Sequence, residues 1–182
     1  MEVEKSRETA RLTLRPFCAA DFEVFVAEML TDARVVEFYY SYRDVDDLGT
    51  IRRQATRDFL DHFEDSRANH DLEVWAAYDK EAFDHLIGWS GLLHTSLSGK
   101  YGGPELQYMI AGDAHGKGYA TELAEATLQH AMHEMDLPSV IATVDIPNQG
   151  SIRVLEKLGF SYEGQIEAYG SSDMYLYRKS LA

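Results

Sequence analysis

Cysteine and proline are scarce in this chain. Cys18 is the only cysteine among 182 residues, and there are four prolines. A single thiol cannot form a disulfide within one chain, so we expect a reducing, cytoplasmic location. Because Cys18 has no Cys-x-x-Cys partner, we expect a small buried residue and not a nucleophile. Four prolines and 13 glycines also exclude a collagen-like or low-complexity chain.

Basic residues are outnumbered by acidic ones. The chain has 17 Lys and Arg against 31 Asp and Glu, which gives a formal net charge of −14. Following the phosphates of a nucleic acid requires clustered Lys and Arg, so we expect no nucleic-acid partner. The same balance favours a cationic substrate.

Long apolar runs are also absent. No segment approaches the roughly 18 apolar residues of a membrane span, and the charged start lacks the apolar core of a signal peptide, so we expect no membrane partner. The length and the 45% hydrophobic content fit one globular domain. We expect a flexible tail over residues 1–10 and a single domain over residues 11–182. His130 and His133 do not form an H-E-x-x-H motif, so we expect no metal site.

Hydrophobic spacing predicts alternating helices and strands. Apolar residues at three-and-four spacing predict helices over residues 21–29, 50–63 and 120–135. Strand patterns cover residues 11–15, 73–78, 86–93, 106–110, 140–145, 160–164 and 173–178. Asn148 and Gly159 mark the ends of a further short helix. This order predicts an α/β or α+β fold with a mixed sheet.

A glycine-rich turn joins one predicted strand to the long predicted helix. Gly116 and Gly118 flank Lys117, which lets the backbone approach a ligand and leaves N–H groups free at a helix start, as in many phosphate sites. The spacing fits neither a Walker A loop nor a dinucleotide fingerprint. Taken alone, the pattern is better explained by a flexible strand-to-helix turn that binds nothing.

Five segments follow one another in an order typical of one enzyme family. They are Arg11–Pro16, Glu105–Ile110, Gly116–Glu122, Asn148–Ser151 and Glu156–Phe160. With them the chain resembles the GNAT N-acetyltransferase superfamily, and within it the branch named for ribosomal-protein N-terminal acetyltransferases. The resemblance implies a mixed central β-sheet with splayed parallel strands flanked by helices, and acetyl-CoA as acyl donor.

The resemblance also implies a donor site. The backbone of Tyr108, Met109 and Ile110 would pair with the pantetheine arm, which Asn148 would also contact. The pyrophosphate would be wrapped by His115, Gly116, Lys117, Gly118, Tyr119 and Ala120. The family loop usually begins with Gln or Arg, where this chain has Asp113, so backbone amides and Lys117 would provide the phosphate contacts.

Acetyl transfer to an amine needs a base and a proton donor. Glu105, at the start of the strand beside the cleft, is the first choice for general base; the alternative is a solvated carboxylate at a strand end. By resemblance, Ser151 is the first choice for protonating the thiolate. Tyr162 and Tyr169 are the other choices, and both are equally compatible with a packing role.

We therefore expect acetyl-CoA-dependent N-acetylation of a primary amine, in a protein N-terminus or a small molecule, by a monomer or homodimer. The alternatives are another acyl donor, an aminoglycoside-type acceptor, or a non-catalytic acyl-CoA-binding sensor. Four acidic residues lie in a region that resembles the acceptor side of the family: Glu37, Asp44, Asp46 and Asp47. A solvated acidic loop is the alternative for this segment.

Overall fold

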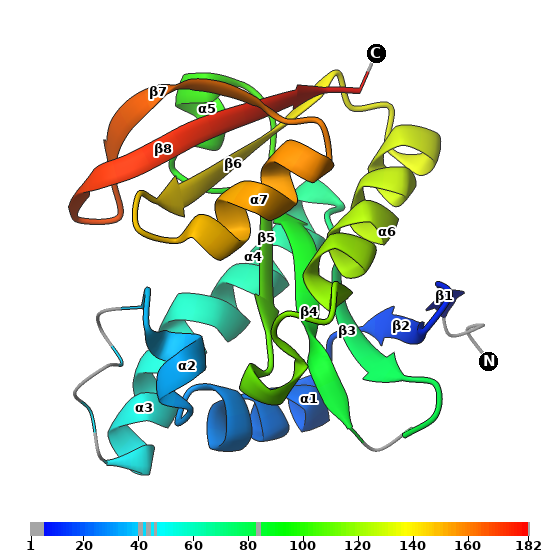
Figure 1. Cartoon of the computed structure of the whole chain (residues 1–182), viewed down its shortest axis with the longest axis vertical. Helices are drawn as coiled ribbons and strands as arrows, with labels where there is room; N and C mark the ends of the chain where they lie inside the picture. The colour runs from blue at the N-terminus through cyan, green and yellow to red at the C-terminus, as the bar shows by residue number, and fades with distance from the viewer. Residues whose placement is uncertain (1–5, 40–41, 43–44, 46, 83–84, 182) are drawn as a thin grey trace.

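A computed structural model describes residues 6–39, 42, 45, 47–82 and 85–181 (Figure 1). In this part of the chain eight strands form one sheet in the order β1-β2-β3-β4-β5-β6-β8-β7. Their bounds are β1 Arg7–Glu8, β2 Leu12–Pro16, β3 Val74–Asp79, β4 Leu86–Leu93, β5 Glu105–Ile110, β6 Ser139–Asp145, β7 Ser161–Ala168 and β8 Ser171–Ser180.

The helices lie between these strands in the sequence. They are α1 Ala19–Val24, α2 Ala33–Val36, α3 Leu48–Ala55, α4 Asp61–His70, α5 Ser98–Tyr101, α6 Tyr119–Glu134 and α7 Gln149–Lys157. A π-helical segment over Phe25–Met29 continues α1, and a second one over Thr56–Leu60 joins α3 to α4. None of the helices within the described ranges has the length and apolar character that crossing a membrane requires.

Strands β5 and β6 are the parallel pair of the sheet, and they separate soon after they begin. Their register contains the single pair Glu105–Ile141, next to which the Ile141 N–H donates to the Pro104 carbonyl at 3.0 Å. Gly103 has a φ of +108°, and a Cβ there would lie 2.5 Å from the Ser139 carbonyl oxygen, so glycine lets the two strands start close together. Beyond this point they diverge (Figure 1), which confirms the predicted sheet with splayed parallel strands.

Two large clusters of buried apolar side chains pack against this sheet, one around β2 to β5 and the other around β5, β6 and β8. Around Trp89, which is fully buried, α1, the two π-helical segments and α4 contribute aromatic rings, including Phe63 at 4.7 Å between ring centroids. Helices α6 and α7 cover β5, β6 and β8 through apolar side chains such as Leu128, Val144 and Leu155. The gap between β5 and β6 therefore lies between two rigid units.

The structure corrects several expected element bounds. Arg7 and Glu8 form β1 and pair with Leu14 and Thr13, where we expected a flexible tail; Arg7 also donates to Glu134 at 2.7 Å. The second predicted helix extends from Leu48 to His70 through its π-helical segment. Helices α2 and α5, of four residues each, were not predicted because they are too short to show a period.

Candidate functional site

A cavity of about 590 Å³ lies where β5 and β6 diverge. The second half of β5, the loop before α6, the first turns of α6 and α7, and the segment around α2 form its walls. Most of the residues expected to bind a donor line it: Tyr108, Met109, Ile110, His115, Gly116, Gly118, Tyr119, Ala120 and Asn148. The sequence therefore identified most of one wall of this cavity.

The loop before α6 presents free backbone N–H groups. Gly116 and Gly118 have φ values of +74° and +83°, which favour glycine, and Gly118 is the N-cap of the 16-residue helix α6. For the N–H groups of residues 116–121, no acceptor is found among the described residues. A helix start with several unpaired N–H groups attracts anions such as phosphates.

Arg11 holds this loop in place. Its Nη1 donates to the Lys117 carbonyl at 2.9 Å, and its guanidinium carbon lies 4.1 Å from the centroid of the Tyr119 ring. Burial opposes ionisation of Glu122, but hydrogen bonds from Thr9 and Arg11 outweigh it and lower the pKa of this carboxyl below its usual value. Hydropathy and spacing do not indicate this role, since they place Arg11 only in a strand, within the segment Arg11–Pro16 that carries the family resemblance.

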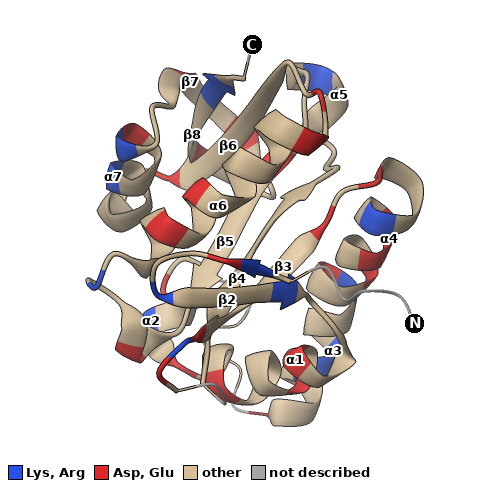
Figure 2. Ribbon diagram, turned by 90° about the vertical axis from the view of Figure 1, so that its right-hand side faces the viewer, with Lys and Arg blue, Asp and Glu red and all other residues tan. Residues whose placement is uncertain are grey.

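The cations at the cavity differ from the one expected. Lys117 is exposed and is not among the lining residues, whereas Arg34, Arg153 and Lys157 are. Arg34 is paired with Asp32. Arg153 and Lys157 lie one helical turn apart on α7, and neither forms an ion pair within the described residues. Figure 2 shows Lys and Arg positions in blue on α7, and the lining of the cavity by Arg153 and Lys157 gives an acidic chain a locally cationic rim there.

His115 has a different contact from the one expected. Its Nε2 lies 2.9 Å from the Ile110 carbonyl oxygen, a contact that ties the loop back onto the end of β5. The imidazole must carry its proton on Nε2 to make this hydrogen bond. His115 thus lines the cavity while its ring is bonded to the protein backbone.

Asn148, Ser151 and Tyr108 are brought together at one wall. The Asn148 Oδ1 accepts from the Ser151 N–H at 3.0 Å and caps α7, as the sequence predicted. The Tyr108 hydroxyl donates to the Ser151 carbonyl at 3.4 Å, and burial raises the pKa of this tyrosine to about 12. All three residues line the cavity, so two hydroxyl groups are available there.

Glu105 is buried, so the structure excludes a solvated carboxylate at a strand end. Its side chain is 1% exposed. Its Oε1 accepts from the Thr143 hydroxyl at 2.6 Å, and its Oε2 accepts from the hydroxyl of Tyr169. Glu105 is not among the residues that line the cavity; it lies at the start of β5, whose second half forms one wall.

Tyr39 links the cavity to Glu105. Tyr39 lines the cavity. Burial is the main cause that raises the pKa of its hydroxyl, and the negative charge of Glu105, then Tyr108 and Asp145, raise this pKa further. These groups are therefore close enough to interact electrostatically with Tyr39. The sequence showed Tyr39 only as one of several aromatic residues in a row.

Of the two tyrosines considered as proton donors, the structure brings only Tyr169 to Glu105. Tyr162 lies on β7, the edge strand, with its ring 5.0 Å from that of Tyr175 and 5.7 Å from that of Tyr177. It is more than half exposed and does not line the cavity. Its expected role near the thiolate therefore has no support in its position.

The acidic segment is only partly visible. Glu37 lines the cavity, and Asp47 caps α3 by accepting from the Thr50 N–H at 2.7 Å. Asp44 and Asp46 lie outside the described residues. Asp47 therefore has a structural role in addition to its charge.

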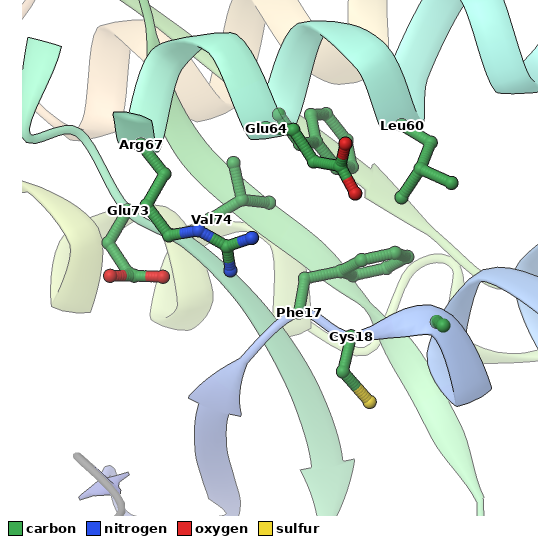
Figure 3. A pocket seen from close by; sticks show the side chains of 9 residues that line it. Phe17, Cys18, Leu60, Glu64, Arg67, Glu73 and Val74 are labelled. Atoms are coloured by element: carbon green, nitrogen blue, oxygen red, sulfur yellow. The ribbon is translucent and has the colours of Figure 1, made fainter. Parts of the chain in front are cut away.

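A second cavity, of about 190 Å³, lies between α4 and the end of β2. Figure 3 shows Phe17 and Leu60 at this cavity, with the Cys18 side chain pointing away from α4. Cys18 is exposed, so the expectation of a buried residue was wrong. Its backbone N–H is bonded to the buried carboxylate of Asp21 at 2.8 Å, which fixes the turn and directs the thiol outward.

The two histidines of α6 have separate partners. His130 Nδ1 lies 3.3 Å from Glu134, and His133 Nε2 lies 3.1 Å from Gln129. Among the described residues there is no group of three or more side chains that could hold a metal ion. These contacts give both histidines local roles on the helix.

Comparisons with known proteins agree with this geometry. The family model described as "Acetyltransferase (GNAT) domain" matches residues 11–161. The uncharacterised protein YkkB of Bacillus subtilis is 26% identical over 180 residues, 99% of both chains, and the probable N-acetyltransferase YjcK of the same organism is 32% identical over 127 residues, 69% of this chain and 67% of YjcK.

One solved structure adds a likeness in fold. The spermidine N-acetyltransferase of Vibrio cholerae, crystallised with CoA and spermine, superimposes with a TM-score of 0.70 at 17% identity. The match covers 95% of this chain and 97% of that one.

Proposed function

Because the chain belongs to the GNAT acetyltransferase family and is an acyltransferase, we propose that it transfers the acetyl group of acetyl-CoA to a primary amine. The observation that carries this proposal is the cavity between β5 and β6, with free N–H groups on one wall and the buried carboxylate of Glu105 at the start of β5. The alternative of a sensor that binds acyl-CoA without turnover has no use for that carboxylate.

The donor is proposed to bind with its phosphates at residues 116–121. Six N–H groups without a partner among the described residues, at the start of a long helix, fit a pyrophosphate. Arg153 and Lys157 extend the positive charge along the rim. Bound acetyl-CoA supplies a thioester, an activated acetyl group that an uncharged amine can attack.

Glu105 is proposed as general base. A new C–N bond forms as the amine nitrogen attacks, the C–S bond breaks, and the proton lost by the nitrogen goes to the Glu105 carboxylate. The departing thiolate takes a proton from a hydroxyl group at the cavity wall, for which Ser151 is the first choice and Tyr108 the second. One proton thus moves from amine to thiol overall.

The acceptor is proposed to be a primary amine, either a cationic small molecule or a peptide N-terminus. A lysine-like amine with a pKa near 10.4 must lose a proton at a cost of about 4 kcal/mol at pH 7.4, whereas an α-amine near 8 needs less than about 1 kcal/mol. A buried base such as Glu105 suits the more demanding amine. Similarity to a spermidine N-acetyltransferase supports the cationic class, and Arg11–Pro16 supports the ribosomal-protein branch.

An acceptor screen tests this proposal. Purified protein is mixed with acetyl-CoA and, in turn, with N-terminal peptides, polyamines and aminoglycosides, and free CoA thiol is followed together with the mass of each amine. A gain of one acetyl group on a primary amine is the expected result. Binding of acetyl-CoA in calorimetry without release of thiol for any amine would favour the sensor.

A further inference from the structure

Both oxygens of the Glu105 carboxylate are already hydrogen-bonded. Thr143 donates to Oε1 at 2.6 Å; Tyr169 donates to Oε2, and the Gln107 amide lies 3.4 Å from the same oxygen. A base accepts a proton only from a group within hydrogen-bond reach. An acceptor amine must therefore take the place of one of these partners.

Tyr169 is the partner that can leave without breaking a strand pair. Thr143 is paired with Leu176 inside the sheet, and Gln107 is paired with Gly91. Tyr169 lies in the two-residue turn between β7 and β8, and it is 57% exposed although its hydroxyl is turned inward. The ring thus covers Glu105 from the surface of the molecule.

The backbone of Tyr169 is held in an uncommon conformation. Its φ is +51°, and that of Gly170 is +79°. Two positive φ values suit a tight hairpin turn, but Asn or Gly normally occupies the first position, where a bulky side chain is disfavoured. Residues kept in such conformations gather at functional sites. Here the bond to Glu105 is the contact that this conformation secures.

The surroundings of the Tyr169 hydroxyl suit an amine. Tyr39, which lines the cavity, interacts electrostatically with both Glu105 and Asp145. Asp145 has its pKa raised by burial and by the charge of Asp173. Two carboxylates that act on one phenol of the cavity wall favour a group that donates N–H bonds and can carry positive charge.

We propose that the Tyr169 hydroxyl occupies the position that the acceptor amine takes when it binds. The turn between β7 and β8, which contains Tyr169 and Gly170, then moves outward as the acceptor binds. The amine then donates to Glu105 Oε2 in place of the phenol, while Thr143 keeps its bond to Oε1. This inference rests on the proposed function, because it takes Glu105 as the base. Tyr169 would then cover the Glu105 carboxylate in the free protein and move away for the acceptor. We call the Tyr169 side chain in this position the cap, and it limits which amines reach the base.

The cap lowers the apparent affinity for the acceptor. If only an uncapped fraction of molecules can bind the amine, the measured dissociation constant is the intrinsic one divided by that fraction. A hydrogen bond to a charged group shifts such an equilibrium by at least about tenfold. Removing the hydroxyl should therefore lower the acceptor KM by about tenfold.

The test compares Tyr169→Phe and Tyr169→Gly with Tyr162→Phe, which removes an exposed hydroxyl on the same hairpin. Tyr169→Phe should lower the acceptor KM about tenfold with kcat and the acetyl-CoA KM unchanged. Tyr169→Gly, which also relieves the positive φ, should in addition accept bulkier amines. Tyr162→Phe should behave like the parent.

Two kinetic results would overturn the cap. A fall in kcat of tenfold or more in Tyr169→Phe, with an unchanged acceptor KM, would make the hydroxyl a catalytic group. Unchanged kinetics would make Tyr169 a surface residue. Hydrogen exchange of residues 169–173 provides a readout without turnover: Tyr169→Phe should speed it, and an unchanged rate also overturns the proposal. A different outcome would count against the proposed function instead: the parent acetylates no amine, while Tyr169→Phe still speeds hydrogen exchange of residues 169–173.

Discussion

Arg11 and Glu122 join the start of strand β2 to the first turn of helix α6. The Arg11 backbone N–H donates to Glu122 Oε1 at 2.8 Å, and its Nε donates to Oε2 at 2.7 Å. The same guanidinium binds the Lys117 carbonyl. One side chain thus holds both ends of the segment whose free N–H groups lie at the cavity.

Replacing Arg11 should weaken donor binding more than it weakens the fold. We expect Arg11→Ala to raise the acetyl-CoA dissociation constant about tenfold, because N–H groups displaced by a fraction of an ångström bind an anion less well. The free energy of unfolding should fall by about 1 kcal/mol or less, since Arg11 is largely exposed. Calorimetry and thermal denaturation measure both quantities. Arg52→Ala, which breaks an exposed pair with Glu23, is the control; equal affinities in the two variants would contradict this role for Arg11.

Glu122 should make stability depend on pH. Its folded-state pKa lies below the ordinary value of 4.5, so its contribution is fully present above that pH and is lost as the pH falls through the folded value. Glu122→Gln should therefore be less stable than the parent by about 1 kcal/mol at pH 7. The difference should shrink as the pH falls below 4.5. Urea unfolding at several pH values tests this, with the exposed Glu125→Gln on the same helix as control; a difference that persists at low pH would speak against it.

Gly118 should be needed for donor binding. Valine strongly disfavours a φ of +83°, so Gly118→Val must change the backbone at the helix start. We expect acetyl-CoA affinity to fall at least about tenfold, because the free N–H groups lose their common direction, while the far-ultraviolet circular dichroism stays unchanged. Gly99→Val is the matched control: a Cβ at Gly99 meets no atom within 4 Å, and its φ is not positive. Parent-like affinity in Gly118→Val would remove the loop from the site.

Glu105 should affect turnover and not donor binding. We expect Glu105→Gln to lower kcat about a hundredfold, within the range of general-base catalysis, and to leave the acetyl-CoA KM nearly unchanged. Part of the activity should return at high pH, where more of the amine is already neutral. The exposed Glu167→Gln is the control. A Glu105→Gln enzyme with parent kcat across the pH range would leave Glu105 with a structural role only.

Local signals made the fold predictable from the sequence. Asn148 and Gly159 bracket α7 because a side-chain cap and a positive φ are properties of single residues. The long amphipathic repeat likewise gave α6 within two residues at its ends. The four-residue helices are too short to produce such a pattern.

The contacts that complete the site are not local, and the sequence could not show them. Thr143 and Tyr169 are 38 and 64 residues from Glu105, and Arg11 is 111 residues from Glu122. Neither hydropathy nor spacing distinguishes Tyr169 from Tyr162; only the turn between β7 and β8 brings one hydroxyl to the base. Family resemblance located the donor loop because its chemistry depends on the backbone, which glycines reveal.

The single Glu105–Ile141 pair between β5 and β6 also suggests an order of events during synthesis. Strands β2 to β5 each pair with the strand before them in sequence, so this sheet can assemble once residue 110 has emerged. The three-stranded unit of β6, β8 and β7 is complete only after residue 180, and it is joined to β5 at that one pair. Since the wall containing Asn148 and the tip containing Tyr169 belong to this late unit, a nascent chain acquires a folded core well before it acquires a working site.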